Sequence, residues 1–309
     1  MKGIQKLFGQ RKQAAAEGEF SPKASLRAKK SFFPRENRVV IIIVFVIFCL
    51  YALSLIYPVL WVFEQSLRQK RDFILHPLSF PSPVVFENYV KIFEKYDVIE
   101  MFINSIILTV GSVAASVLST SIAAYTVSRF RFRGRNFIYA LVIFTMIIPT
   151  TGAMASTYRL MNDWGLSGTY IGLIIKGAGA FGFNFLLLYS YFKNVSYTYS
   201  ESAQLDGASQ WRIFISIMIP IALPSVTAVA IVSFIGHWND YINPYFYLRE
   251  RPTLALGVYL LSSDITSGAD SDYPALFAIM IVTIVPVIVL FSIFQKKIIA
   301  NTIAGGIKG

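Results

Sequence analysis

Few side chains in this sequence could bind or react with a ligand. The strongest candidate is a lysine that lies inside an apolar run. Lys176 lies about two helical turns into the run 170–192. Asn184 follows eight residues later, about 2.2 turns of an ideal helix, so we expect both side chains on one face. A cation inside an apolar segment faces a cavity, a partner charge or the polar end of the segment. Lys176 could therefore bind an acidic ligand, pair with Asp240, or extend its amine towards that end.

A second candidate group ends the apolar run 219–240. Trp238, Asn239, Asp240 and Tyr241 are consecutive. Aromatic faces stack on sugar rings, and amides and carboxylates hydrogen-bond hydroxyl groups, so this group could contact a carbohydrate. An aromatic belt at the end of a membrane span produces the same pattern, and the sequence leaves both alternatives open.

Other patterns point away from cofactor chemistry. The segment 177–182 reads GAGAFG and matches a dinucleotide fingerprint, but it lies inside an apolar run rather than at a strand-to-helix turn. Its glycines predict close packing or an unwound segment beside a cavity. His76 and His237 are far apart, Cys49 is the single cysteine, and no phosphate-binding loop with a Gly-Lys signature occurs. We therefore expect no metal site, no bound cofactor and no catalytic residue in this chain.

The elements that would position these residues are segments long enough to cross a bilayer. The chain is 55% hydrophobic and 15% charged, against about 25% charged in soluble domains. A helix of about 20 apolar residues crosses the hydrocarbon core. The sequence therefore predicts an all-α integral membrane protein with six transmembrane helices, the third broken or kinked near 149–152. The predicted spans are 39–63, 102–127, 137–158, 170–192, 219–240 and 274–294.

Positive charge predicts which way these spans run. Six spans place both termini on one side, and Lys and Arg accumulate in cytoplasmic segments. The segments on the terminal side hold nineteen Lys and Arg, against eight in the three loops on the other side. Both termini and the loop 194–219 are therefore expected in the cytoplasm. Since the basic residues cluster at span ends, the net charge of +11 indicates topology and contact with membrane lipid rather than nucleic-acid binding.

The segments outside the spans differ in character. We expect a basic cytoplasmic tail over 1–38, an extracytoplasmic loop over 64–101, a core of five spans over 102–294, and a second cytoplasmic tail over 295–309. Within the extracytoplasmic loop, the apolar spacing over 86–96 predicts a helix lying on the membrane surface.

The cytoplasmic loop 194–219 has the chemistry of two short helices joined by a turn. Thr198 and Glu201 have capping-box spacing, which predicts a helix start. Asp206 and Gly207 form a turn signal, since glycine adopts backbone angles that other residues resist. A second amphipathic stretch covers 211–218. Small residues would let another protein approach this loop closely: Ser202, Ala203, Gly207 and Ala208.

This loop resembles the motif of ABC importer permeases, which reads Glu-Ala-Ala, then Asp-Gly-Ala, and ends in Ile-x-Leu-Pro. Ser202 stands in place of the first alanine and Ile219 in place of the leucine. The resemblance covers about residues 85–309, and the glycine-rich ending is similar to that of maltose-type permeases. The matching positions are Glu201, Ala203, Asp206, Gly207, Ala208, Ile217 and Pro220, with Asn104-Ser105, Ala124-Tyr125, Arg129, Trp238-Asn239 and 304–309.

The resemblance implies a fold and a mechanism. The fold is the transmembrane domain of a type I ABC importer, whose cytoplasmic coupling helix docks in a groove of an ATPase subunit. Two ATPase subunits would bind ATP and Mg, and a second, non-identical permease subunit and an extracytoplasmic solute-binding protein would complete the importer. Substituting Gly207 by Asp or Pro would uncouple ATP hydrolysis from transport. The implied ATPase contacts are Glu201, Ser202, Ala203, Asp206, Gly207 and Ala208 in the loop, and Gly305 and Gly306 in the tail.

The resemblance to maltose-type permeases, together with the Trp238-Asn239 pair, favours a carbohydrate as cargo, in the form of an oligosaccharide. Lys176 adds the option of an acidic one, and another small solute stays open as an alternative. A stand-alone secondary transporter would need ion-coupling carboxylates inside the spans, where this sequence has almost none. A membrane enzyme would need a convergent catalytic set, which the sequence does not offer. We therefore expect a non-catalytic, multi-pass subunit of the cell membrane.

Overall fold

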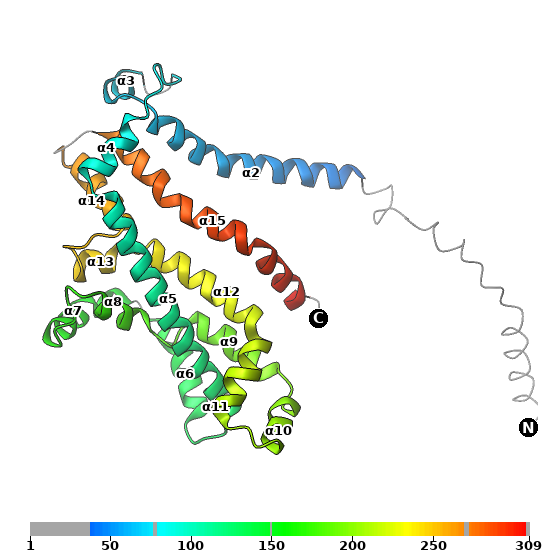
Figure 1. Ribbon diagram of the computed structural model, residues 1–309. Helices are drawn as coiled ribbons and strands as arrows, with labels where there is room; N and C mark the ends of the chain where they lie inside the picture. Colours follow the sequence, from blue (N-terminus) through cyan, green and yellow to red (C-terminus); the bar gives the residue numbers. More distant parts are fainter. Residues whose placement is uncertain (1–37, 77–78, 149, 269–271, 307–309) are drawn as a thin grey trace, which may run out of the picture. The chain divides into compact units, whose positions relative to one another are not determined.

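The computed structural model describes residues 38–76, 79–148, 150–268 and 272–306, and every regular element in these ranges is helical. The chain divides into two compact units, residues 1–58 and 59–309. The elements in Figure 1 are α2 (Arg38–Ser66), α3 (Lys70–Leu75), α4 (Glu87–Lys95), α5 (Val98–Arg129), α6 (Arg135–Thr145), the 3-10 turn η3 (Thr150–Ala153), α7 (Met154–Asp163), α8 (Tyr170–Gly177), α9 (Phe183–Asn194), α10 (Thr198–Leu205), α11 (Gln210–Ile213), the π-helical turn η4 (Phe214–Met218), α12 (Ile219–Trp238), α13 (Ile242–Tyr247), α14 (Leu254–Thr266) and α15 (Tyr273–Gly306).

Within the described ranges, four helical stretches are long and apolar enough to cross a bilayer alone. They cover Val39–Ser66, Val98–Arg129, Gln210–Trp238 and Tyr273–Gln295, with mean hydropathies of 3.2, 1.9, 2.3 and 3.0. These stretches confirm helices at the predicted first, second, fifth and sixth spans. A continuous helix suits such segments because it bonds every backbone group internally, which hydrocarbon requires.

The predicted third and fourth spans are each built from two shorter helices. Between α6 and α7 lies η3, which confirms the predicted break near Gly152; Pro149 lies outside the described residues. The fourth span is not continuous, because α8 ends at Gly177 and α9 begins at Phe183. Gly182, directly before α9, has φ +135°. The glycine-rich segment is therefore unwound, as one of the two sequence interpretations predicted.

Of the first unit, the structure describes residues 38–58, which form the larger part of α2. Their apolar side chains are exposed, for example Phe45 at 66% and Phe48 at 65%. An exposed helix of such composition is stable in hydrocarbon and not in water.

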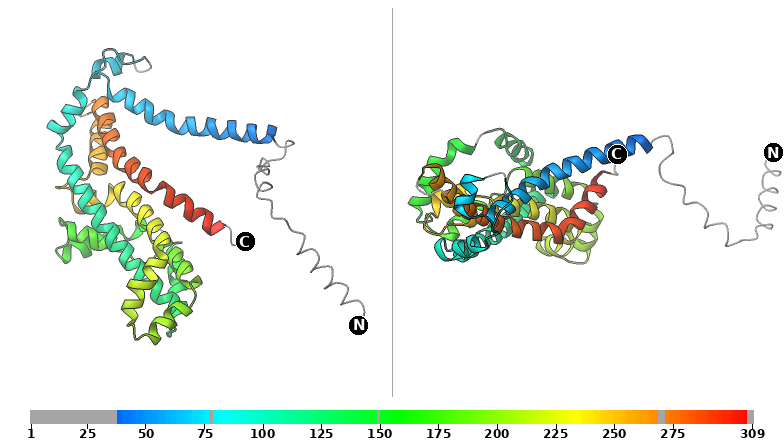
Figure 2. Two further views of the ribbon diagram at one scale, coloured as in Figure 1. Left: turned by 45° about the vertical axis from the view of Figure 1, so that its right-hand side comes forward. Right: turned by 90° about the horizontal axis from the view of Figure 1, so that it is seen from above.

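In the second unit, α5 is the helix around which the others pack. It lies along α8, α9 and α12, and Figures 1 and 2 show it running from α4 and α14 at one end to α6 and α11 at the other. Small side chains make up much of its buried face: Ser105, Thr109, Ser112, Ser116, Thr120, Ser121 and Ala124. Small residues let helix backbones approach closely in a membrane. These small side chains let α8, α9 and α12 pack closely against α5.

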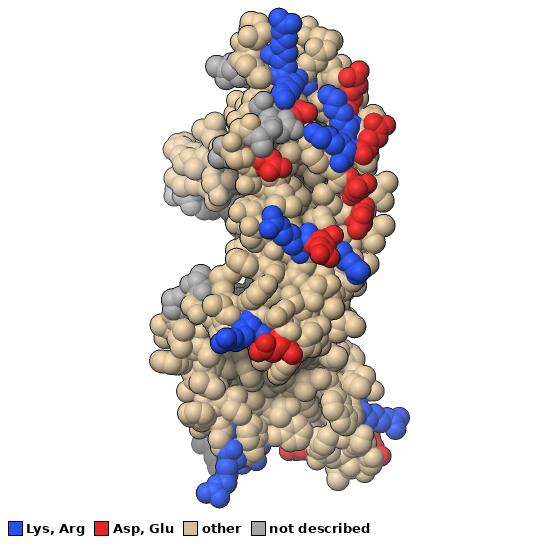
Figure 3. Space-filling model, turned by 90° about the vertical axis from the view of Figure 1, so that its left-hand side faces the viewer, with Lys and Arg blue, Asp and Glu red and all other residues tan. Residues whose placement is uncertain are grey.

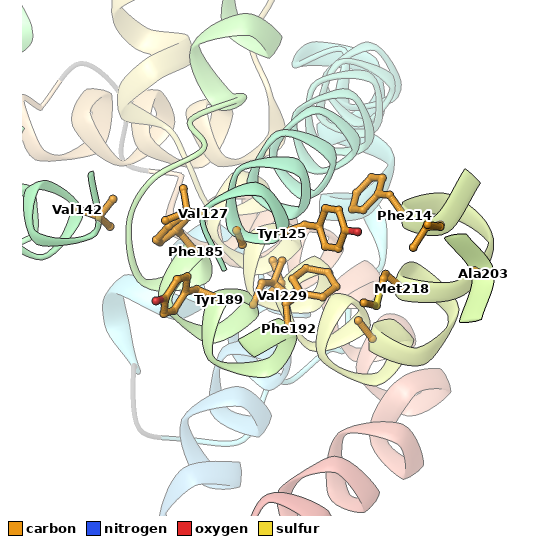
Figure 4. Packing of buried hydrophobic residues seen from close by; sticks show 14 residues of the cluster. Tyr125, Val127, Val142, Phe185, Tyr189, Phe192, Ala203, Phe214, Met218 and Val229 are labelled. Atoms are coloured by element: carbon orange, nitrogen blue, oxygen red, sulfur yellow. The ribbon is translucent and has the colours of Figure 1, made fainter. Parts of the chain in front are cut away.

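The described part of the second unit has three buried apolar clusters, and two of them lie at the ends of α5. One joins α5, α9, η4 and α12, and Figure 4 shows Tyr125 of α5 lying among Phe192, Phe214 and Met218. The ring of Tyr125 lies 4.9 Å from that of Phe214 and 5.6 Å from that of Phe192, between ring centroids. The other cluster joins α4, α14 and α15 with Trp238. Each cluster therefore fastens one end of α5.

The segment after α2 is more ordered than its polar composition predicts. Arg68 is fully buried, and its guanidinium lies 3.1 Å from the Asp72 carboxylate and 3.6 Å from the Glu64 carboxylate. Asn88 of α4 donates to the backbone oxygens of Ser66 and Arg68, at 2.8 and 2.7 Å. Figure 3 shows acidic and basic side chains together over the upper part of one face, where α3 and α4 lie in Figure 1. Paired charges and bonded carbonyls make this burial tolerable.

The predicted surface helix over 86–96 is present as α4, but it does not simply lie on the surface. Ile92 has no exposed area and belongs to the cluster formed with α14 and α15, while Val90 and Phe93 are exposed. One face of α4 therefore packs on the protein, and the open face mixes charged residues with Val90 and Phe93.

The region between the predicted fifth and sixth spans contains helices that the sequence analysis treated as loop. α14 begins after Thr253, whose hydroxyl accepts a hydrogen bond from the Leu256 amide. Leu254 and Leu256 have no exposed area. α14 packs on α5 and α15, so this outer segment is part of the core.

Candidate functional site

The loop 194–219 folds as two short helices joined by a turn, as the sequence predicts, with one correction at its start. α10 begins at Thr198, so Thr198 is inside the helix and the expected capping box is not formed; the residue before the helix, Tyr197, makes no side-chain cap. The Ser196 hydroxyl instead accepts a hydrogen bond from the Thr198 amide at 3.3 Å. A serine two residues before the helix thus replaces the predicted cap.

The turn after α10 has the geometry that its glycine predicts. Gly207 has φ +78°, in the left-handed region, and its amide donates to the Gln204 oxygen at 3.0 Å. The next helix, α11, is capped by the Ser209 hydroxyl, which accepts from the Arg212 amide. From Gln210 the chain runs through η4 into α12 as one helical stretch ending at Trp238. A displacement of α10 can therefore reach α12 through a short turn and a continuous helix.

The predicted contact residues in α10 and the turn after it fall into two groups, which differ in burial. Glu201, Ser202, Asp206 and Gly207 are exposed. Ala203 is 9% exposed and packs in the cluster around Tyr125, and Ala208 packs partly against the same cluster. Ala203, and in part Ala208, therefore pack against this subunit's own core and are less open to a partner than the first group.

The sequence analysis did not single out Leu205, which the structure leaves open to solvent. Leu205 ends α10 and is 90% exposed, an unusual position for a leucine in a polar loop. Large apolar side chains at an exposed tip are typical of a surface that a partner covers. The signal was available in the sequence, since Leu205 is the large apolar residue between Glu201 and the Asp206-Gly207 turn.

A cavity of about 210 Å³ opens at the break between α8 and α9. Its walls come from α5, α8, α12 and α13, and the unwound segment contributes backbone. The polar residues lining it are Ser112, Lys176, His237, Asp240, Asn243 and Thr253. The glycines of the unwound segment therefore line a cavity, as one interpretation of the sequence predicted.

Lys176 lines this cavity in a chain of polar groups. Its Nζ donates to Oδ1 of Asn243 at 2.7 Å and lies 5.6 Å from the centroid of the Tyr247 ring. The Asn243 amide Nδ2 in turn donates to Asp240 Oδ2, at a short separation. The link between Lys176 and Asp240 thus runs through Asn243. The lysine side chain is exposed, so two of its three donors remain available to a ligand.

The structure separates the other predicted substrate contacts from Lys176. Asn184 belongs to α9, beyond the break, and donates to the Ser233 hydroxyl at 3.1 Å, so the expectation of one shared helix face was wrong. Trp238 is 2% exposed, and its indole donates to the Thr283 oxygen at 3.0 Å. Trp238 therefore packs in the protein interior, and the face of its ring is covered.

Asn239 and Tyr241 are more accessible. Asn239 is exposed, although its amide is bonded to the Ile235 oxygen at 2.9 Å. Tyr241 is 38% exposed and stacks on Tyr259, with ring centroids 4.7 Å apart. The sequence analysis missed His237 and Asn243, which reach the cavity because α12 and α13 meet there.

The tail residues are described by their backbone alone. α15 continues as a helix through Gly305 and Gly306, and residues 307–309 lie outside the described residues. α15 therefore extends through the part of the predicted tail, 295–309, that the structure describes.

Comparison with known proteins places this chain among transport proteins. Residues 115–302 match the family described as binding-protein-dependent transport system inner membrane component. The chain is 32% identical over 257 residues to the diacetylchitobiose uptake system permease protein NgcG of Streptomyces coelicolor, covering 83% of this chain and 85% of that protein. It is 26% identical to the polygalacturonan/rhamnogalacturonan transport system permease protein YtcP of Bacillus subtilis, covering 89% of this chain and all of that protein.

A solved structure has the same fold. It is the crystal structure of a bacterial ABC transporter involved in the import of the acidic polysaccharide alginate; the TM-score is 0.72, with 26% identity, 86% of this chain covered and 98% of the other. The apolar helices and these likenesses agree on an all-α, multi-pass protein of the inner membrane. The chain therefore belongs to the binding-protein-dependent transport system inner membrane components, the permease subunits of ABC importers.

Proposed function

We propose that this permease subunit imports a carbohydrate, in the form of an oligosaccharide. The observation that carries the cargo assignment is the cavity at the break between α8 and α9, where Lys176, His237, Asp240 and Asn243 present hydrogen-bonding groups. Hydroxyl-rich ligands need such convergent donors and acceptors. The relatives support the proposal, because their names specify diacetylchitobiose and galactooligosaccharides, among other sugars.

ATP hydrolysis drives this import through partner subunits. Two ATPase subunits bind ATP and Mg, and the exposed face of α10, with Glu201, Ser202, Leu205 and Asp206, docks on one of them. This chain contributes no catalytic residue. When the ATPases close, α10 moves with them, and α12 follows through the continuous helix from Gln210. The spans then switch access by rigid-body motion.

The importer is completed by a solute-binding protein and a second permease, which we propose to be a different chain. Co-purification tests this assembly. Mild detergent extraction of the tagged subunit should recover an ATPase and a second permease, whereas recovery of this chain alone would contradict the proposed assembly.

A second candidate cargo is an acidic oligosaccharide. The specific observation is Lys176, whose free donors face the cavity while its third bonds Asn243. Polygalacturonan and alginate, named for a relative and for the matching structure, are acidic polymers. A carboxylate held by a lysine gains a charge-assisted hydrogen bond worth about 1.5–3 kcal/mol.

Uptake into proteoliposomes containing the full importer separates the two cargoes. Substituting Lys176 by Met should raise the KM for an acidic oligosaccharide by about tenfold or more and leave that for a neutral one little changed. Lys193→Met, on an exposed position of α9, is the matched control. Equal uptake of the acidic sugar by Lys176→Met and the parent would remove the acidic assignment. Absence of any carbohydrate uptake by the parent importer would contradict the carbohydrate proposal itself.

A further inference from the structure

The last residue of α5 is a buried arginine. Arg129 is 8% exposed, whereas Arg131 and Arg133, two and four residues further along the same cytoplasmic segment, are exposed. A guanidinium loses its hydration when it is buried, so its position requires strong compensating contacts. Those contacts show which parts of the molecule Arg129 holds.

Two of these contacts are with the end of another helix. The Nη1 group of Arg129 donates to the Val195 oxygen at 2.9 Å, and Nη2 donates to the Ser196 oxygen at 3.1 Å. α9 ends at Asn194, so both carbonyls lie directly beyond its C-terminus, where the helix dipole favours a cation. The planar fork of arginine reaches two acceptors at once, which a lysine amine on a flexible stem does less well.

The remaining contacts are with the residues that directly precede α10 and α12. The Arg129 guanidinium carbon lies 4.2 Å from the centroid of the Tyr197 ring, and Tyr197 is the residue directly before α10. Nη2 also lies 4.0 Å from the sulfur of Met218, the last residue before α12. One side chain therefore contacts the entry to α10 and the start of α12 from the end of α5.

This position matters because α5 has no short covalent path to α10. α12 follows α10 through the Gly207 turn and α11, whereas α6, η3, α7, α8 and α9 separate α5 from α10 along the chain. α5 also supplies Leu108 and Ser112 to the cavity wall. Packing contacts at the cytoplasmic end of α5 therefore give a movement of α10 a direct route to α5 and to the part of the wall that α5 supplies.

We propose that Arg129 is a positioning residue that locks the entry of α10 to the end of α5, so that α5 and α10 move together when the ATPases close. This inference rests on the proposed ATP-driven import. Without the lock, α10 can move with the ATPases while α5 lags, and ATP is hydrolysed with less cargo moved.

The number of cargo molecules imported per ATP hydrolysed tests the lock in proteoliposomes containing the full importer. Arg129→Gln removes the charge and the fork and should lower this ratio about tenfold, the size expected for loss of charge-assisted hydrogen bonds. Arg129→Lys keeps the charge and should lower it less. Arg133→Gln, an exposed arginine on the same segment, is the matched control and should match the parent. A parent-like ratio for Arg129→Gln overturns the proposal.

Tyr197 provides a second test that does not depend on a buried residue. Its side chain is 48% exposed, so substitution should leave folding intact. Tyr197→Phe keeps the ring face under the guanidinium and should retain the parent ratio, while Tyr197→Leu should lower it by about two- to fivefold, as expected for a cation–π contact. Equal ratios for the Leu and Phe variants would overturn the role given to this contact.

A distance measurement tests the lock without any cargo. Spin labels at Thr126→Cys on α5 and Thr198→Cys on α10, both exposed positions, are introduced with Cys49→Ser in the complete importer. The distance between the labels should be the same with and without a trapped nucleotide, and Tyr197→Leu or Arg129→Gln should broaden or shift it. A nucleotide-dependent distance in the otherwise unaltered importer overturns the proposal. Because this readout needs no sugar, it holds even if the carbohydrate assignment fails.

Discussion

The turn at Gly207 allows a sharp prediction about coupling. Its φ of +78° lies in the left-handed region, and a Cβ built on it meets no atom within 4 Å. An added side chain is therefore resisted by the backbone angle and not by this subunit's own packing. For a non-glycine residue that region costs about 1–2 kcal/mol, so Gly207→Ala should reduce the population of the native turn by about tenfold.

Two further substitutions should have a smaller and a larger free-energy cost than Gly207→Ala. Gly207→Asn should cost less, because asparagine tolerates left-handed angles. Gly207→Pro should cost about 3 kcal/mol or more, since proline holds φ near −65° and removes the amide that donates to the Gln204 oxygen. Aspartate tolerates the same angles as asparagine, so Gly207→Asp compared with Gly207→Asn isolates the effect of an added charge at the docking surface.

The assay is cargo imported per ATP hydrolysed by the reconstituted importer, together with recovery of the ATPase on purification. The expected order of coupling is parent, Asn, Ala, then Pro, with all variants inserting in the membrane. If Asn, Ala and Pro variants lose coupling equally, the reason is space needed by the docked partner rather than the backbone angle, and the conformational argument is refuted.

The remaining predictions concern stability, measured by thermal unfolding of the purified subunit in detergent. Asn88→Ala leaves the buried backbone oxygens of Ser66 and Arg68 without their donor, and should lower stability by about 2–4 kcal/mol, while Asn162→Ala, at an exposed position, should have little effect. Trp238→Phe removes the hydrogen bond to the Thr283 oxygen and part of a buried ring. It should lower stability by about 1–3 kcal/mol without changing the KM for sugar. A raised KM with unchanged stability would restore the sugar-stacking hypothesis.

Short-range features of the candidate site could be predicted from the sequence. The turn at Gly207 follows from the backbone freedom of one residue type, and the helix on either side follows from local spacing. Which face of α10 is buried could not be predicted, because the burial of Ala203 depends on a cluster that includes Tyr125 of α5, far away along the chain. Leu205 was missed for the same reason, since exposure of an apolar residue is a property of the folded surface.

The residues that line the cavity, and the contacts between them, could be predicted from the sequence only in part. Lys176 was identified because a cation in an apolar run is costly, but its link to Asp240 passes through Asn243, a residue of a helix that the sequence analysis did not expect. Asn184 was assigned to the same face by assuming a continuous helix, and the break before Gly182 invalidates that assumption. Helix continuity depends on how glycine-rich backbone is satisfied by neighbours, such as the Ser119 hydroxyl that donates to the Ala178 oxygen at 2.7 Å.

By itself, the sequence determined that this chain is a helical membrane protein, where four of its long helices lie, and that a helix and a glycine turn form the cytoplasmic loop. These properties depend on the free energy of transferring apolar residues to hydrocarbon and on local backbone preferences, both of which can be evaluated over a few neighbouring residues. The tertiary structure alone decided which side chains meet. It buried Trp238 beside α15, turned Ala203 inward, gathered Lys176 with Asn243, and brought Arg129 against Val195 and Tyr197. Those contacts join segments that lie far apart along the chain, so they follow from the packing of whole helices and not from any local pattern.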